Sequence, residues 1–203
     1  MKKVLLLVVA LTMATVSVKA QEEDYDLRHE VSISYGALSC SQILDAFRAA
    51  YDMWAGAQLD GRTSIVGPIS AEYYYHIEDW FAVGGIVAFG RTSQDIFYYD
   101  EVGGGKIGKD YNTYYTVMPS VKFNWFRREH FGLYSKIAAG VTIRNMKAVS
   151  LDPRWQTYNE TLTHFNFQAT AIGAEFGGVN FRGFVELGMG EQGVALAGLR
   201  WRF

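Results

Sequence analysis

The sequence has little that could hold a small exported protein together covalently. Cys40 is the single cysteine among 203 residues, so no disulfide can form within the chain, although export leads to a compartment where disulfides persist. Beyond the first residues there is no apolar run of the roughly 20 residues that a membrane helix needs. If the chain resides in a membrane, it must cross as a closed sheet, because only helices and barrels satisfy every backbone group in lipid.

The sequence also lacks an excess of positive charge and has no clear enzyme motif. The formal net charge is -2, from 19 basic and 21 acidic residues, which gives no electrostatic reason to bind nucleic acid. The histidines are dispersed without the spacing of a metal site, so we expect no metal and no cofactor. His164, beside Asn166, is the nearest candidate for a hydrolytic site, but its strand parity points inward and no suitably placed serine follows. We therefore expect no catalytic residues.

The N-terminus predicts export. A short basic start, an apolar run over 4–14 and small residues up to Ala20 are typical of a secretory signal peptide. We predict that 1–20 is this signal peptide, cleaved after Ala20, and that 21–203 forms a single barrel domain. An uncleaved N-terminal anchor is the alternative. Cleavage removes three lysines and no acid, which changes the net charge from -2 to -5 over 183 residues.

Side chains alternate through most of the remaining chain. The clearest case is the C-terminal stretch, where the apolar Leu199, Trp201 and Phe203 alternate with Arg200 and Arg202. Successive strand side chains point to opposite faces, so this is a strand with one apolar and one charged face. Similar strands are predicted over 29–37, 65–76, 81–90, 115–125, 131–144, 164–176 and 181–189, with a bulge near Gly173 to Phe176, where the alternation breaks.

Alternation fits both a soluble sandwich and a transmembrane barrel, because it does not say which face is buried. Short connections at 77–79, 127–130 and 177–180 alternate with long ones, as in outer-membrane barrels, and small inward residues suit a narrow eight-stranded interior. We predict an all-β fold: an eight-stranded antiparallel up-and-down transmembrane β-barrel with both termini periplasmic. Two aromatic girdles are expected: Tyr75, Trp80, Phe81, Trp125, Phe126, Phe131, Phe181, Trp201 and Phe203 near the short turns, and Tyr35, Phe89, Tyr115 and Phe165 towards the other side.

The predicted lumen is charged. None of the predicted outward positions carries a charge, whereas the inward-facing charged network comprises Glu72, Lys122, Lys136, Arg144, Arg182, Glu186, Arg200 and Arg202. Unpaired charges would be very costly in so narrow an interior, so we predict that they pair and plug the lumen, with the excess of bases reaching the rims. A three-residue turn over 191–193 would set Phe184 opposite Arg200.

The long loops 38–61, 92–111 and 146–160 are where an external ligand or host surface would bind. Residues 39–57 are predicted as a short amphipathic helix, because Ser39 and Gln42 have capping-box spacing and the apolar side chains share one side. That side either packs on the barrel mouth as a lid, which we favour, or faces an interface or partner. Gly103 to Gly105 are expected to form a flexible tip, and Trp155 and Tyr158 could contact sugars.

These features together resemble the small outer-membrane β-barrel family, the OmpA/OmpX-type barrels of Gram-negative bacteria, over residues 29–203. Leu199, Trp201 and Phe203 match the family's C-terminal assembly signal, which the barrel-assembly machinery recognises. The resemblance implies an outer-membrane location with outer-membrane lipid around the barrel. Because the family is functionally mixed, we expect a non-enzymatic structural or surface-interaction protein. The alternatives are a narrow ligand channel or transport protein and a lipid-modifying enzyme.

Overall fold

The computed structural model describes residues 27–54, 63–100, 103–150 and 157–203. The predicted signal peptide, its cleavage site and Trp155 lie outside these ranges. Helix α2 (Cys40–Trp54) follows the first strand, and the strands are β1 (His29–Ala37), β2 (Thr63–Glu78), β3 (Phe81–Asp100), β4 (Gly103–Arg127), β5 (Phe131–Ser150), β6 (Tyr158–Gly177), β7 (Phe181–Gly190) and β8 (Ala195–Arg202).

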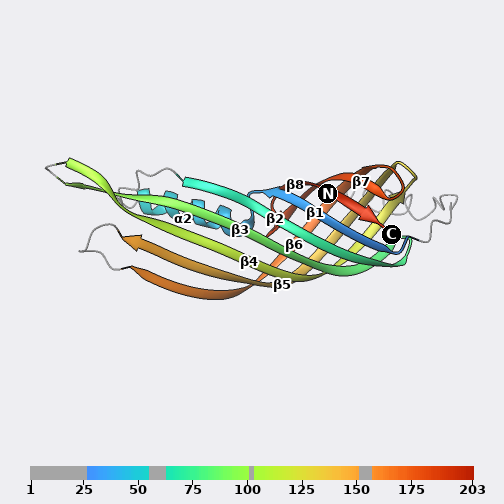
Figure 1. Ribbon diagram of the computed structural model, residues 1–203, viewed down its shortest axis with the longest axis horizontal. Helices are drawn as coiled ribbons and strands as arrows, with labels where there is room; N and C mark the ends of the chain where they lie inside the picture. Colours follow the sequence, from blue (N-terminus) through green and yellow to red (C-terminus); the bar gives the residue numbers. More distant parts are fainter. Residues whose placement is uncertain (1–26, 55–62, 101–102, 151–156) are drawn as a thin grey trace, which may run out of the picture.

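The eight strands close into an antiparallel barrel in chain order, with β8 paired back onto β1 (Figure 1). His29 and Phe203 exchange two backbone hydrogen bonds of 2.9 Å, which join the two ends of the described chain. The predicted eight-stranded up-and-down barrel is therefore confirmed. Within the described ranges, no helix is both long enough and apolar enough to cross a membrane.

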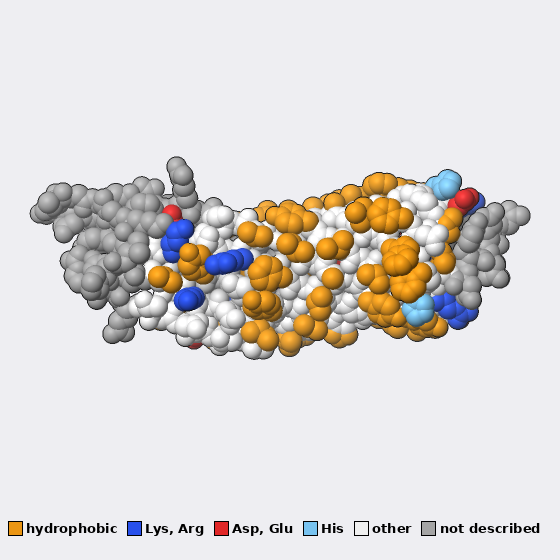
Figure 2. Space-filling view, viewed as in Figure 1, with side chains coloured by type: hydrophobic (Ala, Val, Ile, Leu, Met, Phe, Trp, Pro, Cys, Tyr) orange, Lys and Arg blue, Asp and Glu red, His pale blue; other side chains and the backbone are white. Residues whose placement is uncertain are grey.

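An apolar belt surrounds the barrel. Outward side chains such as Ile33, Val117 and Leu187 are 57 to 58% exposed, and Figure 2 shows such side chains covering the middle of the molecule. Aromatic rings pack along its edges, with Trp201 and Phe203 5.0 Å apart near the tight turns and Phe89 and Tyr115 5.4 Å apart on the other side. An apolar surface of this extent belongs in lipid, so the chain is a transmembrane β-barrel.

The strands differ in length. β1, β7 and β8 have 9, 10 and 8 residues, close to the roughly 9 to 11 needed to cross a bilayer. By contrast, β3, β5 and β6 have 20 residues and β4 has 25. Together with β2, which has 16 residues, these make five strands that continue past the end of the closed barrel (Figure 1). We call this extension the outer sheet: 63–68, 90–100, 103–114, 144–150 and 158–167.

The outer sheet corrects the loop predictions. Most of 92–111 and 146–160 is paired strand, and Gly103 to Gly105 lie at the start of β4 rather than in a flexible tip. The reason is that hairpin arms stay paired beyond the membrane, where water accepts polar side chains on both faces. Gln94, for example, still pairs with Asp110.

The final hairpin also differs from its predicted register. Arg182, rather than Phe184, lies opposite Arg200. The Gly188 N–H donates to the Val194 carbonyl at 2.9 Å, which makes the loop wider than three residues. Gly190 and Gly193 adopt φ values of 146° and 109°, which glycine reaches without strain, and these permit the wider loop.

Candidate functional site

Charged side chains fill the lumen near the tight turns, a region we call the turn end. Seven of the eight residues predicted to face inward are at most 3% exposed there: Glu72, Lys122, Lys136, Arg182, Glu186, Arg200 and Arg202. Arg144 is the exception. It lies in the outer sheet, where it contacts α2.

Two buried glutamates were missing from the predicted set. Glu30 lies within 3.1 Å of Lys122, Arg200 and Arg202. Glu175 lies within 2.9 Å of Arg182, Arg200 and Arg202. The lumen therefore holds acids that balance most of the basic excess, and Arg182 also donates to the backbone carbonyls of the turns at the rim.

These two glutamates explain an arrangement that would otherwise be unfavourable. Lys122 lies directly opposite Lys136, and Arg182 lies directly opposite Arg200. Like charges opposite each other on neighbouring strands destabilise a sheet. Here Glu175 pairs with both arginines and Glu30 pairs with Lys122, while Lys136 pairs with Glu72 and Glu186. Carboxylates from other strands thus neutralise the opposed bases and link the wall through its interior.

Aromatic rings close the remaining space. The Tyr134 hydroxyl donates to Glu186 at 2.6 Å, and the Arg200 guanidinium lies 4.7 Å from the Tyr134 ring and 4.3 Å from the Phe184 ring. The rings lie directly against glycines of the wall: a Cβ on Gly173 would be 2.4 Å from Tyr134, and one on Gly198 would be 2.7 Å from Phe184. At this level the rings therefore pack directly against the wall.

Two further layers lie above the charges. Ile86, Met118 and Ala138 form a buried apolar cluster. At the mouth, the loop between β7 and β8 folds inward, and Gln192 donates to Glu72 at 2.5 Å. Ion pairs, apolar side chains and this loop thus fill the lumen in succession.

Helix α2 covers the outer end of the lumen. Its start is the predicted capping box, in which the Gln42 N–H donates to Ser39 at 3.2 Å and the Ser39 N–H donates to Gln42 at 3.1 Å. The Ser41 hydroxyl donates to Glu191 at 2.7 Å. Asp45 then accepts from Arg144 at 2.8 Å and from the Tyr114 hydroxyl, so polar contacts fix the helix to the outer sheet.

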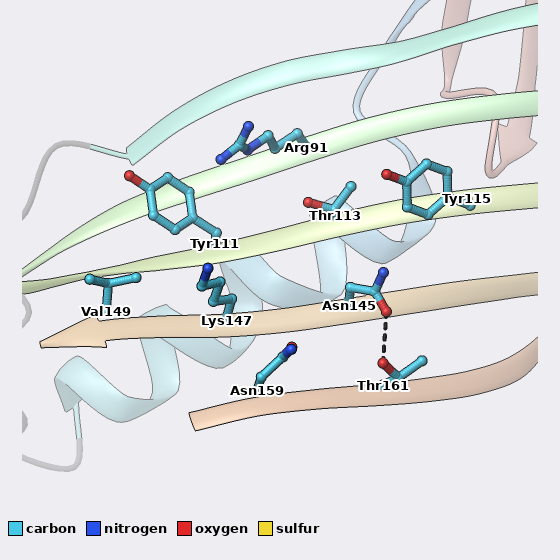
Figure 3. Close-up of a pocket in the computed structure, with 9 residues that line it drawn as sticks. All are labelled: Arg91, Tyr111, Thr113, Tyr115, Asn145, Lys147, Val149, Asn159 and Thr161. Carbon is cyan, nitrogen blue, oxygen red and sulfur yellow. Dashed lines mark hydrogen bonds between the residues drawn. The ribbon is translucent and has the colours of Figure 1, made fainter. Parts of the chain in front are cut away.

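The favoured prediction that α2 packs its apolar side on the barrel is wrong. Leu44, Phe47 and Tyr51 are 68, 70 and 65% exposed. The polar side faces the wall because the mouth is lined by groups that need partners, chiefly Arg144 and Glu191. The apolar side consequently points away from the outer sheet, which lies in front of α2 in Figure 3.

The outer sheet has two edges, which differ. On β2, the edge residues are occupied by side chains: Gln42 donates to the Val66 carbonyl at 2.9 Å, the Gly67 N–H donates to the Tyr35 hydroxyl at 3.0 Å, and Pro68 follows. On β6, β7 pairs only from Gln168 onward. Among the described residues, no strand pairs with the other side of 159–166, and we call this stretch the free edge.

The described part of the chain offers few residues with the surroundings of a catalytic or metal-binding group. His164 is exposed, and its ring lies 3.4 Å from the Asn166 amide rather than beside a serine and a carboxylate. No cluster of three potential metal ligands occurs in the described ranges. Partial burial, together with Glu191, raises the pKa of the Cys40 thiol, which makes it a weak nucleophile near neutral pH.

Comparisons with known proteins give structural likeness at low identity. No protein-family model matches the sequence, and a search of curated proteins found no match. Among solved structures, Ail, the attachment invasion locus protein of Yersinia pestis, is 18% identical with a TM-score of 0.47, over 87% of this chain and 99% of that one. The N-terminal β-barrel domain of Pseudomonas aeruginosa OprF is 16% identical with a TM-score of 0.36, over 86% and 97%. Neither activity transfers at these values.

Proposed function

We propose that this outer-membrane barrel is a non-enzymatic surface-interaction protein that binds an extended segment of an external protein along the free edge of β6. The observation that carries the proposal is the backbone of 159–166, which pairs with β5 on one side and, among the described residues, with no strand on the other. An exposed strand edge presents a row of N–H and C=O groups that another strand can pair with.

The contrast between the two edges supports this assignment. Natural sheets protect edges with proline, bulges or covering side chains. The β2 edge has Pro68, a register shift between Val66 and Ile69, and the Gln42 contact. The β6 edge is long, rich in β-forming residues and exposed on both faces, with Leu162 at 44% and Phe165 at 72%. Only one of the two edges is thus suited to strand addition.

Helix α2 adds specificity to such a site. A strand added to β6 would direct alternate side chains to the concave side of the outer sheet. On that side α2 exposes Leu44, Phe47 and Tyr51. The partner segment that fits best is therefore β-prone and carries apolar residues at every second position. The charged and aromatic side chains packed inside the lumen favour this role over the transport alternative.

The test uses the full chain in lipid nanodiscs and a random twelve-residue peptide library displayed on phage. We expect selected peptides to slow hydrogen exchange of those amides in 159–166 that point away from β5, because these amides become hydrogen-bonded. Leu162→Lys combined with His164→Lys should abolish peptide binding, since charges on an edge oppose strand addition. Ile65→Lys on the β2 edge is the matched control and should leave binding intact. Peptides that protect other amides only, or that bind the double variant equally well, would refute the proposal.

A further inference from the structure

The outer sheet carries a second surface, formed by side chains on its outward face rather than by the edge backbone of β6. A shallow groove of about 490 Å³ crosses β3, β4, β5 and β6 on the outward face, a size that suits a small molecule or headgroup. Figure 3 shows Arg91 and Lys147 on either side of Tyr111, with Asn145 and Thr161 below them. We call this surface the basic groove.

The charge of the basic groove is of one sign. Arg91 and Lys147 are both exposed, and none of the side chains lining the groove is acidic. Asp95 is the next acidic side chain outward on β3, and it lies 3.6 Å from Lys109. The two lining bases therefore keep their charge available, and the groove is suited to an anion.

The remaining side chains hold the bases in place and add donors. The Arg91 guanidinium lies 4.7 Å from the centre of the Tyr111 ring, and such stacking orients a guanidinium without neutralising it. Thr161 donates to the Asn145 side-chain oxygen at 2.8 Å, which leaves the Asn145 amide nitrogen to donate into the groove. Arg91 and Lys147 are two strands apart, about 10 Å, and two residues apart along the strands, about 7 Å. Two long side chains can meet over that span on one phosphate.

The level of the groove relative to the lipid narrows the choice of anion. Arg91 is the next outward residue after Phe89, and Asn145 is the next after Ile143. These polar side chains therefore begin about 7 Å along the strands beyond the apolar belt, which is roughly 5 Å along the membrane normal for strands tilted by about 35 to 45°. The headgroup layer of a bilayer extends roughly 5 to 8 Å beyond the hydrocarbon on each side. Figure 2 shows basic side chains just past the end of the belt on this face.

We propose that the basic groove binds the phosphate of an outer-leaflet lipid whose acyl chains lie along the belt below it. A lipid phosphate at this depth meets the guanidinium, the ammonium and the amide together, whereas its chains cover Phe89, Tyr115 and Ile143. Charge-assisted contacts of this kind are the strong ones in phosphate recognition. The groove shares Asn159 and Thr161 with the free edge, but it is formed by outward-facing side chains, whereas strand addition uses the backbone groups at the edge of β6.

The test measures binding of bis-phosphorylated lipid A and of its dephosphorylated form to the full chain in detergent, by native mass spectrometry. We expect the wild type to prefer the phosphorylated lipid at least tenfold, and Arg91→Gln and Lys147→Gln each to weaken it roughly tenfold. Arg128→Gln is the matched control: Arg128 is also exposed and lies 5.3 Å from an aromatic ring, that of Phe126, but at the turn end. It should leave binding unchanged.

Three results would overturn the proposal. The first is equal binding of the two lipid forms, and the second is unchanged preference in the Arg91→Gln, Lys147→Gln double variant. The third is that inorganic phosphate or a soluble sulfated oligosaccharide binds the groove as tightly as the lipid, because the acyl chains would then contribute nothing. Heat-modifiable gel migration of every variant checks that the barrel has folded.

Discussion

The turn end and the outer sheet are built from the same strands but treat polar groups in opposite ways. At the turn end, Glu175 contacts three arginines and is 1% exposed. In the outer sheet, the comparable pair of Asp95 and Lys109 is 3.6 Å apart, with side chains 22 and 43% exposed. A buried charge must be fully paired, whereas an exposed pair contributes little. Enclosure within the lumen, rather than residue type, therefore decides whether a charged group is buried and fully paired or stays exposed and available.

The same contrast applies to the backbone. In the membrane, β6 pairs with β5 and β7, so its backbone is satisfied on both sides. On the outer side of Gln168, β6 pairs only with β5 in the described part of the chain. Water or a partner must supply the remaining backbone hydrogen bonds. The sheet must therefore close into a barrel where lipid surrounds it, but it can remain open beyond the lipid. That is why a binding edge can exist in the outer sheet alone.

The largest expected effect comes from breaking the buried network. Glu175→Gln removes the carboxylate shared by Arg182, Arg200 and Arg202, and loss of one partner from a buried ion pair costs about 3 to 5 kcal/mol. Urea unfolding in lipid vesicles, followed by tryptophan fluorescence, should show a loss of this size in the free energy of unfolding. Glu160→Gln, at an exposed position of the outer sheet, is the control and should change it by less than about 0.5 kcal/mol. Similar losses in the free energy of unfolding for both variants would show that the buried network stabilises the barrel no more than an exposed side chain does.

A smaller effect is expected where α2 meets the outer sheet. Asp45→Asn removes the charge that Arg144 binds at 2.8 Å, and hydrogen bonds to charged groups contribute about 1.5 to 3 kcal/mol. Hydrogen exchange of α2 amides should accelerate accordingly, while amides of β7 and β8 keep their protection. Asp95→Asn, which changes the exposed pair with Lys109, should leave α2 unaffected. Exchange that accelerates throughout the barrel would mean that the helix is part of its folding unit.

Much of the fold was predictable because lipid imposes a strict rule on sequence. An outward side chain in the belt must be apolar, so strands such as 131–144 show their period of two directly. The outer sheet obeys no such rule. Residues 158–165 are exposed on both faces, and their mixture of Thr, Asn, Glu and Leu gave no alternation from which pairing could be inferred.

The site was less predictable than the fold. Glu175 lies beyond a register shift between Thr170 and Ile172, which exchanges inward and outward positions, so parity counted from His164 missed it. Glu30 had the parity of an inward residue and could have been included. The orientation of α2 depends on Arg144, which is 99 positions away from Asp45 in the chain, and no local pattern encodes such a contact. An amphipathic pattern alone predicted that the apolar side would be buried.

The Cys40 thiol gives a pH test of how closely the first turn of α2 packs on the mouth. Burial and the Glu191 carboxylate raise the pKa of this thiol, so at any pH below it the reactive thiolate fraction is smaller than for an ordinary cysteine. Alkylation by iodoacetamide at pH 8 should be several-fold slower than that of Ala46→Cys in a Cys40→Ser background, where the residue is exposed. The ratio should shrink as the pH rises. Equal rates at pH 8 would mean that the mouth is open to solvent.

The smallest effect is expected from shortening the outer sheet, which should leave the closed part of the barrel unchanged. Ser93 pairs with Tyr111, so replacing 94–110 by an Asn-Gly turn preserves the register of β3 and β4. The deleted part carries the exposed pair of Asp95 and Lys109 and none of the buried network, and the free energy of unfolding should change by less than about 1 kcal/mol. In planar bilayers, neither the full chain nor the shortened one should conduct, because Glu30, Glu175, Tyr134 and Phe184 fill the lumen at the turn end. A steady conductance comparable to that of a porin, appearing only after shortening, would place the seal in the outer sheet instead.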